Sequence, residues 1–263
     1  MKTLDFSYYM ELKFDEPVSG HHFTIKCMPQ TTVRQRIEEL RVDVYPNRFL
    51  SYDEDSFGNK CIYGHMEDAH DHFEIRMEGR AVTGIAPAET ETDAVHAGMF
   101  RYQTQMTRPG KEILALAKSV SFAQEASNYE KARLLMKKLH ENFSYVPGVT
   151  DVETTAEEAL ALGKGVCQDY THIMLSLCRI YQIPARYAVG LLEGEGQSHA
   201  WAEVWSDGGF FPLDPTNNCV VGDAHIHISS GRDYRDCMIN QGIFTGAAQQ
   251  KREIHALVTQ AEQ

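Results

Sequence analysis

The sequence predicts an α+β protein, in which an antiparallel β-sandwich precedes a second domain of helices packed on an antiparallel sheet. As far as about Thr83 the chain is strand-like, and turn signals such as EPVSGH, YPN and DSFGN divide it. From Lys111 onward helical periodicity dominates, and alternating segments return after Pro184. We therefore expect a β-sandwich-like N-terminal domain over residues 1–90 and the second domain over residues 91–263.

The individual elements follow from local patterns. The N-terminal strands are expected at Ser7–Phe14, His22–Met28, Glu39–Val44 and His72–Met77. Helices are expected at Lys111–Ser121, Asn128–Phe143 and Thr154–Leu162, the last capped by Thr154 or Thr155. The later strands are RYAVGLL, HAWAEVW, GFFPLD and HIHIS.

Composition and charge exclude several classes of partner. The 263 residues are 43% hydrophobic and 10% aromatic, which suffices to fill sizeable cores. A formal net charge of -12, with no block of Lys and Arg to reverse it locally, repels phosphate backbones and anionic headgroups. We expect no nucleic-acid partner and no membrane partner, and the sequence leaves the oligomeric state open.

The first residues and the cysteines indicate the compartment. The segment MKTLDFSYYMELKFDEP carries acidic residues where a signal peptide needs an apolar run, which favours a cytoplasmic protein. The cysteines lack CxxC spacing, so reduced thiols are expected rather than a disulfide framework or a zinc site. They are Cys27, Cys61, Cys167, Cys178, Cys219 and Cys237. No cofactor is expected.

The stretch GKGVCQDYTHIMLSLC places a cysteine at the start of a helix. Cys167 extends an apolar stripe that runs from Tyr170 to Tyr181, and Pro184 ends the helix. At a helix N-terminus, free N–H groups and the dipole lower the pKa of a thiol, and the Cys167 N–H is a candidate oxyanion donor. Gly163 and Gly165 allow the backbone to approach a substrate closely. A cysteine on an apolar stripe is also compatible with a core role.

A hairpin downstream supplies possible partners for this thiol. Alternation puts His199, Trp201, Glu203 and Trp205 on one face of a strand. A turn at Ser206–Gly209 would pair Trp205 with Phe210 and bring Asp214 diagonal to His199, within reach of a carboxylate–imidazole hydrogen bond. Cys167, His199 and Asp214 then form a nucleophile, a base and an orienting carboxylate. A turn-capping Asp214 and a half-buried structural His199 remain alternatives.

Three segments resemble the motif blocks of the transglutaminase-like superfamily, in the bacterial branch usually described as cysteine proteases. They are GVCQDYTHIMLSLCRIYQIPARY, SHAWAEVW and DPTNN, followed by GRDYRD, and together they cover Thr150 to Asp236. The first domain resembles the β-rich region that often precedes this core. The resemblance implies a papain-like core in which Cys167 attacks an amide carbonyl, His199 exchanges the proton and Asp214 orients the histidine. The segment DCMINQG departs from the branch, which often has a proline there.

Further residues are candidates for binding. We expect Trp201, Gly165 and Gln168 to contact substrate, and Asp169 to bind loop N–H groups. The histidine clusters HMEDAHDH and HIHIS are expected to be a polar turn and a strand rather than metal sites. We find neither the calcium ligands of eukaryotic transglutaminases nor a CxxC zinc pair, and expect no metal.

These features favour a cysteine-nucleophile enzyme that cleaves amide bonds of a peptide or protein substrate through a thioester. Protein-glutamine acyl transfer, as in transglutaminases, shares the acyl-enzyme and is the first alternative. A non-catalytic binding module that retains the fold is the second.

Overall fold

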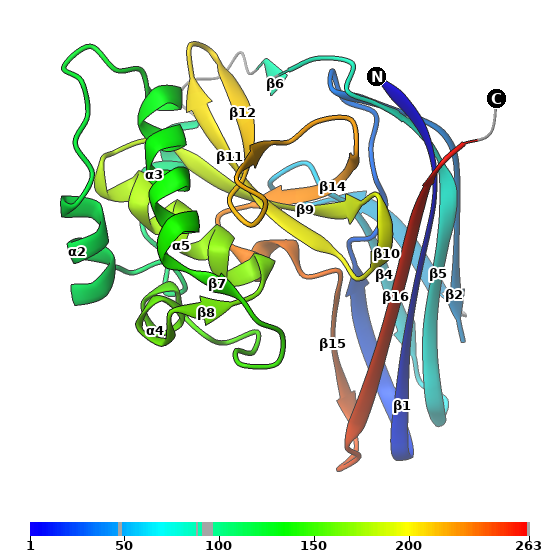
Figure 1. The fold of residues 1–263 in the computed structure, drawn as a ribbon. Coiled ribbons are helices and arrows are strands. Elements are labelled where there is room, and N and C mark those ends of the chain that lie inside the picture. The colour runs from blue at the N-terminus through cyan, green and yellow to red at the C-terminus, as the bar shows by residue number, and fades with distance from the viewer. Residues whose placement is uncertain (47–48, 88, 91–96, 262–263) are drawn as a thin grey trace.

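The computed structural model describes residues 1–46, 49–87, 89–90 and 97–261. The predicted α+β class is confirmed. Long antiparallel strands stand on one side of the molecule, helices on the other, and a second antiparallel sheet lies between them (Figure 1).

The N-terminal strands are organised around one long strand. They are β1 (Lys2–Ile25), β2 (Gln35–Tyr45), β3 (Phe49–Glu54), β4 (Lys60–Met66) and β5 (His70–Thr83). The first part of β1 pairs with β5 and its last part with β4, all antiparallel. The predicted turn EPVSGH lies inside β1, where the pairing registers shift and Gly20 has a φ of 55°. The turn signal therefore marks an irregularity within one strand rather than the end of a strand.

Alternation along β1 builds the core of this sheet. Its inward side chains include Leu4, Phe6, Tyr8 and Met10, all of which are at most 3% exposed. They share a core with residues of the second sheet such as Ile226. The two sheets therefore pack directly against each other.

The helical side begins after the short β6 (Glu89–Thr90). It contains η1 (Met99–Arg101), α2 (Lys111–Lys118), α3 (Asn128–Asn142), α4 (Ala156–Leu162) and α5 (Cys167–Ile180). The predicted helix starts at Lys111 and Asn128 are confirmed. Thr155, rather than Thr154, caps α4 and forms a capping box with Glu158.

The second sheet carries α5 on one face. Its strands are β9 (Ala185–Leu192), β11 (His199–Ser206), β12 (Gly209–Asp214), β13 (Cys219–Val220) and β14 (His225–Gly231). They run in the order β13-β12-β11-β9-β14, and β6 pairs with β12. Two short strands, β7 (Ser144–Tyr145) and β8 (Lys164–Gly165), pair in parallel beside α5. Residues 169–179 of α5 are all buried.

The end of the chain returns to the first sheet. After η2 (Tyr234–Cys237), β15 (Asn240–Thr245) and β16 (Gln250–Gln260) both pair with β1, and β10 (Gly194–Gly196) pairs with β16. Figure 1 shows β16 in red beside β1 in blue. The sequence assigned all of residues 91–263 to the second domain, whereas residues 240–260 lie in the N-terminal sheet. The division near residue 90 stays a prediction.

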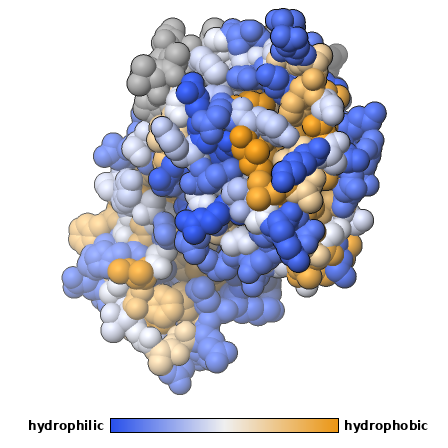
Figure 2. Space-filling model, turned by 90° about the vertical axis from the view of Figure 1, so that its left-hand side faces the viewer, coloured by the Kyte–Doolittle hydropathy of each residue, from blue (hydrophilic) through white to orange (hydrophobic). Residues whose placement is uncertain are grey.

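The surface of the helical side is mixed in character. Figure 2 shows the helical face, where hydrophilic residues surround small hydrophobic groups. The exposed hydrophobic side chains of the helices include Leu114 of α2 and Leu134 of α3. Within the described ranges, no helix has the length and apolar character needed to cross a membrane. The cytoplasmic location stays a prediction.

The histidines of HMEDAHDH lie largely within strands, since His65 belongs to β4 and His70 to β5.

Candidate active site

Cys167 is the first residue of α5, and the chain approaches it from α4. Helix α4 ends at Leu162 and is capped by Gly163, whose φ of 69° is left-handed, a conformation that glycine adopts at little cost. This capping role explains why residue 163 is a glycine, and it requires no contact with a substrate. Cys167 itself is partly exposed, whereas Cys178 on the same helix is fully buried.

Asp169 holds the first turn of α5 in place. Its Oδ2 accepts hydrogen bonds from the Val166 N–H at 2.7 Å and from the Thr150 hydroxyl at 2.7 Å. Burial raises the pKa of Asp169. The side chain binds a loop N–H group, as the sequence predicted.

Gly165 makes room for this carboxylate. A Cβ on residue 165 would lie 2.3 Å from Oδ2 of Asp169, so any larger residue displaces the acid. Gly165 is buried and lies beneath the turn that presents Cys167. The geometry supports a structural requirement for Gly165 rather than the substrate contact that the sequence predicted.

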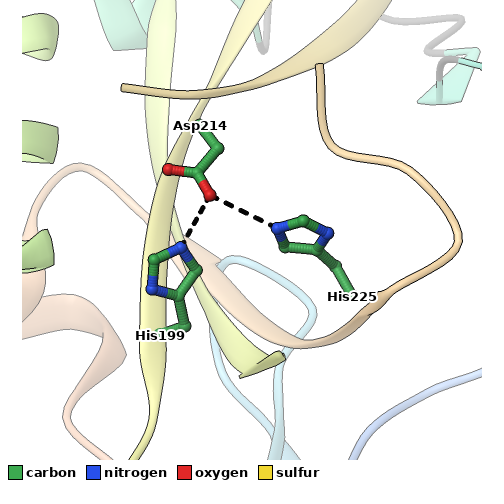
Figure 3. A group of neighbouring side chains, drawn as sticks. All are labelled: His199, Asp214 and His225. Atoms are coloured by element: carbon green, nitrogen blue, oxygen red, sulfur yellow. Dashed lines mark hydrogen bonds and ion pairs between the residues drawn. The ribbon is translucent and has the colours of Figure 1, made fainter. Parts of the chain in front are cut away.

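The hairpin formed by β11 and β12 brings His199 and Asp214 together. Trp205 pairs with Phe210, so the predicted register is confirmed. His199 Nε2 lies 2.8 Å from Asp214 Oδ2, and both side chains are buried (Figure 3). The alternate residues Ala200 and Ala202 pack on the core that contains α5.

Asp214 also organises the turn that follows it. Its Oδ1 accepts hydrogen bonds from the N–H groups of Thr216 at 2.9 Å and Asn217 at 3.2 Å, and its Oδ2 accepts one from Asn217 Nδ2 at 2.7 Å. Burial alone raises the pKa of Asp214, but hydrogen bonds from His199, His225 and Asn217 hold it far below its usual range. The sequence left turn capping and histidine binding as alternatives; the carboxylate does both.

His225 is a neighbour of Asp214 that the sequence analysis missed. Its Nε2 lies 3.4 Å from Asp214 Oδ2 (Figure 3). Its ring meets the Trp201 ring edge to face, with 5.5 Å between the ring centroids. His225 belongs to β14, which pairs with β9 and not with the hairpin. The HIHIS pattern predicted a strand, but it did not indicate which side chains His225 would contact.

The protonation of His199 is set by its two neighbours. Burial lowers its pKa, but hydrogen bonds with Asp214 and Cys167 outweigh burial and raise the pKa to about 10. These two contacts therefore favour the protonated ring. Because Nε2 donates to Asp214, Nδ1 is the nitrogen that remains for the Cys167 thiol.

Two grooves meet at Cys167 and His199. We call the first the sheet-side groove; its volume is about 420 Å³, and its walls come from the core and from the N-terminal sheet. Its lining includes Gln168, Tyr187, Tyr234, Tyr8 and Arg252. We call the second the loop-side groove; its volume is about 550 Å³, and it includes Tyr145, Gly148, Glu195 and Ser198. The two grooves could hold an extended peptide substrate on either side of the Cys167 thiol.

Two predicted substrate contacts are placed differently. Gln168 lies in the sheet-side groove, where its side-chain amide donates to the Val152 carbonyl at 3.2 Å. Trp201 is fully buried behind His199 and lines a separate cavity of about 480 Å³. Its indole N–H donates to Glu203 at 3.2 Å. This geometry supports packing of Trp201 against His199 and no contact with a substrate at Cys167.

In the part of the chain that the structure describes, His199, Asp214 and His225 form a group whose ligand atoms could surround a metal ion, since these atoms lie within 4.8 Å of one another. The contact of 2.8 Å between His199 and Asp214 is a hydrogen-bond distance, shorter than two ligands of one zinc ion usually keep. The arrangement fits a hydrogen-bonded pair better than a metal centre. The expectation of no metal stays a prediction.

Comparison with known families agrees with this site. Residues 115–215 match the sequence model of the transglutaminase-like superfamily, and residues 4–82 match the bacterial transglutaminase-like N-terminal region. The chain belongs to the transglutaminase-like superfamily. Cys167, His199 and Asp214 all lie within the first match, and the family places this transglutaminase-like chain among cysteine-type enzymes.

Relatives resemble the transglutaminase-like chain over most of its length. An uncharacterized protein of Mycobacterium leprae is 25% identical, and the match covers 89% of this chain and 90% of the relative. An uncharacterized protein of Mycobacterium tuberculosis is 26% identical, with 89% and 84% covered. A solved structure described as a "putative cysteine protease" from Cytophaga hutchinsonii has a TM-score of 0.80 at 19% identity, and the match covers 100% of this chain and 92% of that one. This likeness shows a shared fold.

Proposed function

We propose that the protein is a cysteine-dependent amide hydrolase that acts on peptide or protein substrates. The observation that carries the proposal is the position of His199, which is hydrogen-bonded to the buried Asp214 at 2.8 Å and lines both grooves together with Cys167. A protonated imidazole beside a thiol favours the thiolate, which is the nucleophilic form of cysteine.

The reaction proceeds by acyl transfer to the thiol. Cys167 Sγ bonds to the amide carbonyl carbon, and His199 gives its Nδ1 proton to the departing nitrogen as the C–N bond breaks. The amine leaves and a thioester remains on Cys167. Water then attacks the thioester while His199 takes one of its protons, and the acid departs as the thiolate and the imidazolium are restored. Asp214 keeps the ring oriented and stabilises its charge.

The N-terminus of α5 stabilises the oxygen of the tetrahedral intermediate. The N–H groups of Asp169 and Tyr170 already donate to the Val166 carbonyl. Those of Cys167 and Gln168 have no carbonyl acceptor within the helix, because the first N–H groups of a helix lack one. The Cys167 N–H is therefore our candidate oxyanion donor.

Transfer to an amine rather than to water is the runner-up. Both reactions share the thioester and differ only in the second acceptor. Open grooves on both sides of Cys167 admit water, which favours hydrolysis.

The test combines a thiol-directed, amide-mimicking probe library with mass spectrometry of the intact protein. We expect an adduct on Cys167 that Cys167→Ala abolishes, together with hydrolysis of the peptides that the best probes resemble. Incorporation of a labelled amine into a glutamine-bearing protein, exceeding hydrolysis, would favour the acyltransferase. Absence of any adduct on Cys167 would favour the binding module and contradict the proposal.

A further inference from the structure

The N-terminal sheet contributes a wall of the sheet-side groove, and that wall carries a cation. In the pairing of β1 with β16, Tyr8 lies opposite Ala256, Met10 opposite Ile254, and Leu12 opposite Arg252. Directly opposed residues share a face, so Arg252 lies in the same inward row as these apolar residues. Arg252 itself is exposed, and it lines the sheet-side groove, so its guanidinium is accessible there.

Among the residues that the structure describes, Arg252 has no carboxylate partner. Its guanidinium lies close enough to Tyr234 and Tyr8 of the same groove to influence the pKa of both hydroxyls. The adjacent Lys251, on the outer face, is paired with Glu253 at 2.7 Å. Asp151, the acidic residue of this groove, is already engaged by the Glu153 N–H at 2.9 Å. The guanidinium of Arg252 is therefore available to a ligand.

Two buried polar atoms in the same wall have no hydrogen-bond partner in the described part of the chain. The Tyr8 hydroxyl belongs to a side chain that is 1% exposed, and Asn240 Oδ1 is likewise buried without a hydrogen bond. An unsatisfied buried polar group costs about 1–3 kcal/mol, so such groups call for an explanation. Both residues line the groove, but the two atoms themselves are buried, so contact with a ligand requires the lining side chains to shift.

The geometry points to a subsite for a peptide that carries a carboxylate, with Arg252 pairing with that carboxylate, Asn240 accepting a peptide N–H and the Tyr8 hydroxyl completing the hydrogen bonds. This inference rests on the proposed function, because it names the substrate class of the same site. A guanidinium binds a carboxylate through two parallel N–H···O bonds, which gives direction as well as affinity. The net charge of -12 repels acidic peptides from the molecule as a whole, so a local cation is needed to hold one.

The experiment measures retention of peptides by the Cys167→Ala protein, which cannot turn them over. An equimolar pool of short peptides, matched in pairs that differ only by Glu or Gln at each position, is applied and the retained fraction is identified by mass spectrometry. Because the pool varies every position, it samples both sides of the thiol. We expect enrichment of Glu over Gln, reduced about tenfold or more by a second change, Arg252→Gln. Lys251→Gln removes the same charge from the outer face and should leave the enrichment intact.

Tyr8→Phe separates a ligand contact from a merely structural role. Removing an unsatisfied buried hydroxyl should keep or raise the melting temperature, and a ligand contact should in addition lower retention of the Glu peptides severalfold. Equal Glu enrichment with and without Arg252, or no retention of Glu peptides, overturns the subsite. Failure of Cys167 to form an adduct overturns the proposed function instead, and leaves an Arg252-dependent enrichment standing as a binding property.

Discussion

Arg34 of the N-terminal half and Glu203 of β11 form an ion pair in which Nη1 lies 3.0 Å from Oε1 and Glu203 is fully buried. The other carboxylate oxygen of Glu203 pairs with Arg186 at 2.7 Å, and Trp201 donates to the first. Glu203 lies on the same strand face as His199. It therefore links the N-terminal half of the chain to the strand that carries the candidate base.

Glu203→Gln should make the melting temperature less sensitive to a fall in pH. Burial alone raises the pKa of Glu203, but Arg186, His227 and Arg34 lower it from 4.5 to about 2. A depressed folded pKa means that the ionised group stabilises the fold above pH 4.5 and that this contribution is lost as the pH falls toward 2. We expect the variant to lose several degrees in melting temperature at pH 7 and little at pH 2.5. The exposed Glu78→Gln is the control, and an equal loss at both pH values would contradict the assignment.

Cys167 should react with iodoacetamide far faster than the other five cysteines near neutral pH. Its closest competitor is Cys219, which is also partly exposed but whose pKa is raised by burial. Burial raises the pKa of Cys178 to about 12, which makes it inert. Peptide mapping after timed alkylation gives the rates. Modification of Cys219 as fast as Cys167 would show that exposure alone sets reactivity.

Asp214→Asn should lower turnover by on the order of 10³-fold while changing KM little, because the carboxylate orients His199 and stabilises its charge without touching substrate. An amide keeps the Oδ1 acceptor for the N–H groups of Thr216 and Asn217, but its NH2 group replaces the oxygen that accepts from His199 and from Asn217 Nδ2, so the melting temperature should fall. Initial rates on a substrate found with the probe library give kcat and KM separately. A rise in KM with unchanged kcat would mean that Asp214 acts in binding.

His225→Leu removes one donor to Asp214 without touching the thiol. The 3.4 Å separation indicates a weak bond, so we expect a fall in turnover of about tenfold or less. His225→Gln retains an N–H donor and should recover part of the rate. Equal rates in both variants and in the wild type would show that His225 only packs against Trp201.

Gly165→Ala should destabilise the protein by about 1–3 kcal/mol, because the new Cβ collides with the Asp169 carboxylate. It should also slow alkylation of Cys167, since Asp169 holds the turn through the Val166 N–H. Gly222→Ala, where the added Cβ meets no atom within 4 Å, is the matched control. A stable variant with unchanged alkylation would show that the first turn of α5 tolerates movement of Asp169.

The site was predictable wherever local patterns determine structure. Alternation in HAWAEVW and the turn residues of SDGG fix which face of β11 carries His199, so the register that brings Asp214 to it followed from sequence. Capping residues and the Pro184 stop likewise defined the helices. The DSFGN turn was recognised, but its flanking strands β3 and β4 were not, because Phe49–Glu54 is largely exposed and lacks a clear alternation.

The contacts that sequence could not give join segments far apart in the chain. Nothing local in β16 signals that it pairs with β1, and Arg252 was therefore not considered. His225 lies beyond a loop whose path sequence does not determine, so its approach to Asp214 was not foreseen. Trp201 was placed on the correct face, but alternation does not tell whether that face opens onto substrate or onto packed side chains.

The pairing of β1 with β16 has a consequence for the order of folding. It joins residues near opposite ends of the chain, such as Leu4 and Gln260, so its loop-closure entropy is among the largest in the fold. During synthesis, one edge of β1 stays without its partner until the last strand emerges, and an unpaired edge is prone to aggregation. We therefore expect the groove wall that carries Arg252 to be completed late, so that a chain shortened by β16 would lack both a protected edge and the Arg252 and Ile254 side chains of the sheet-side groove.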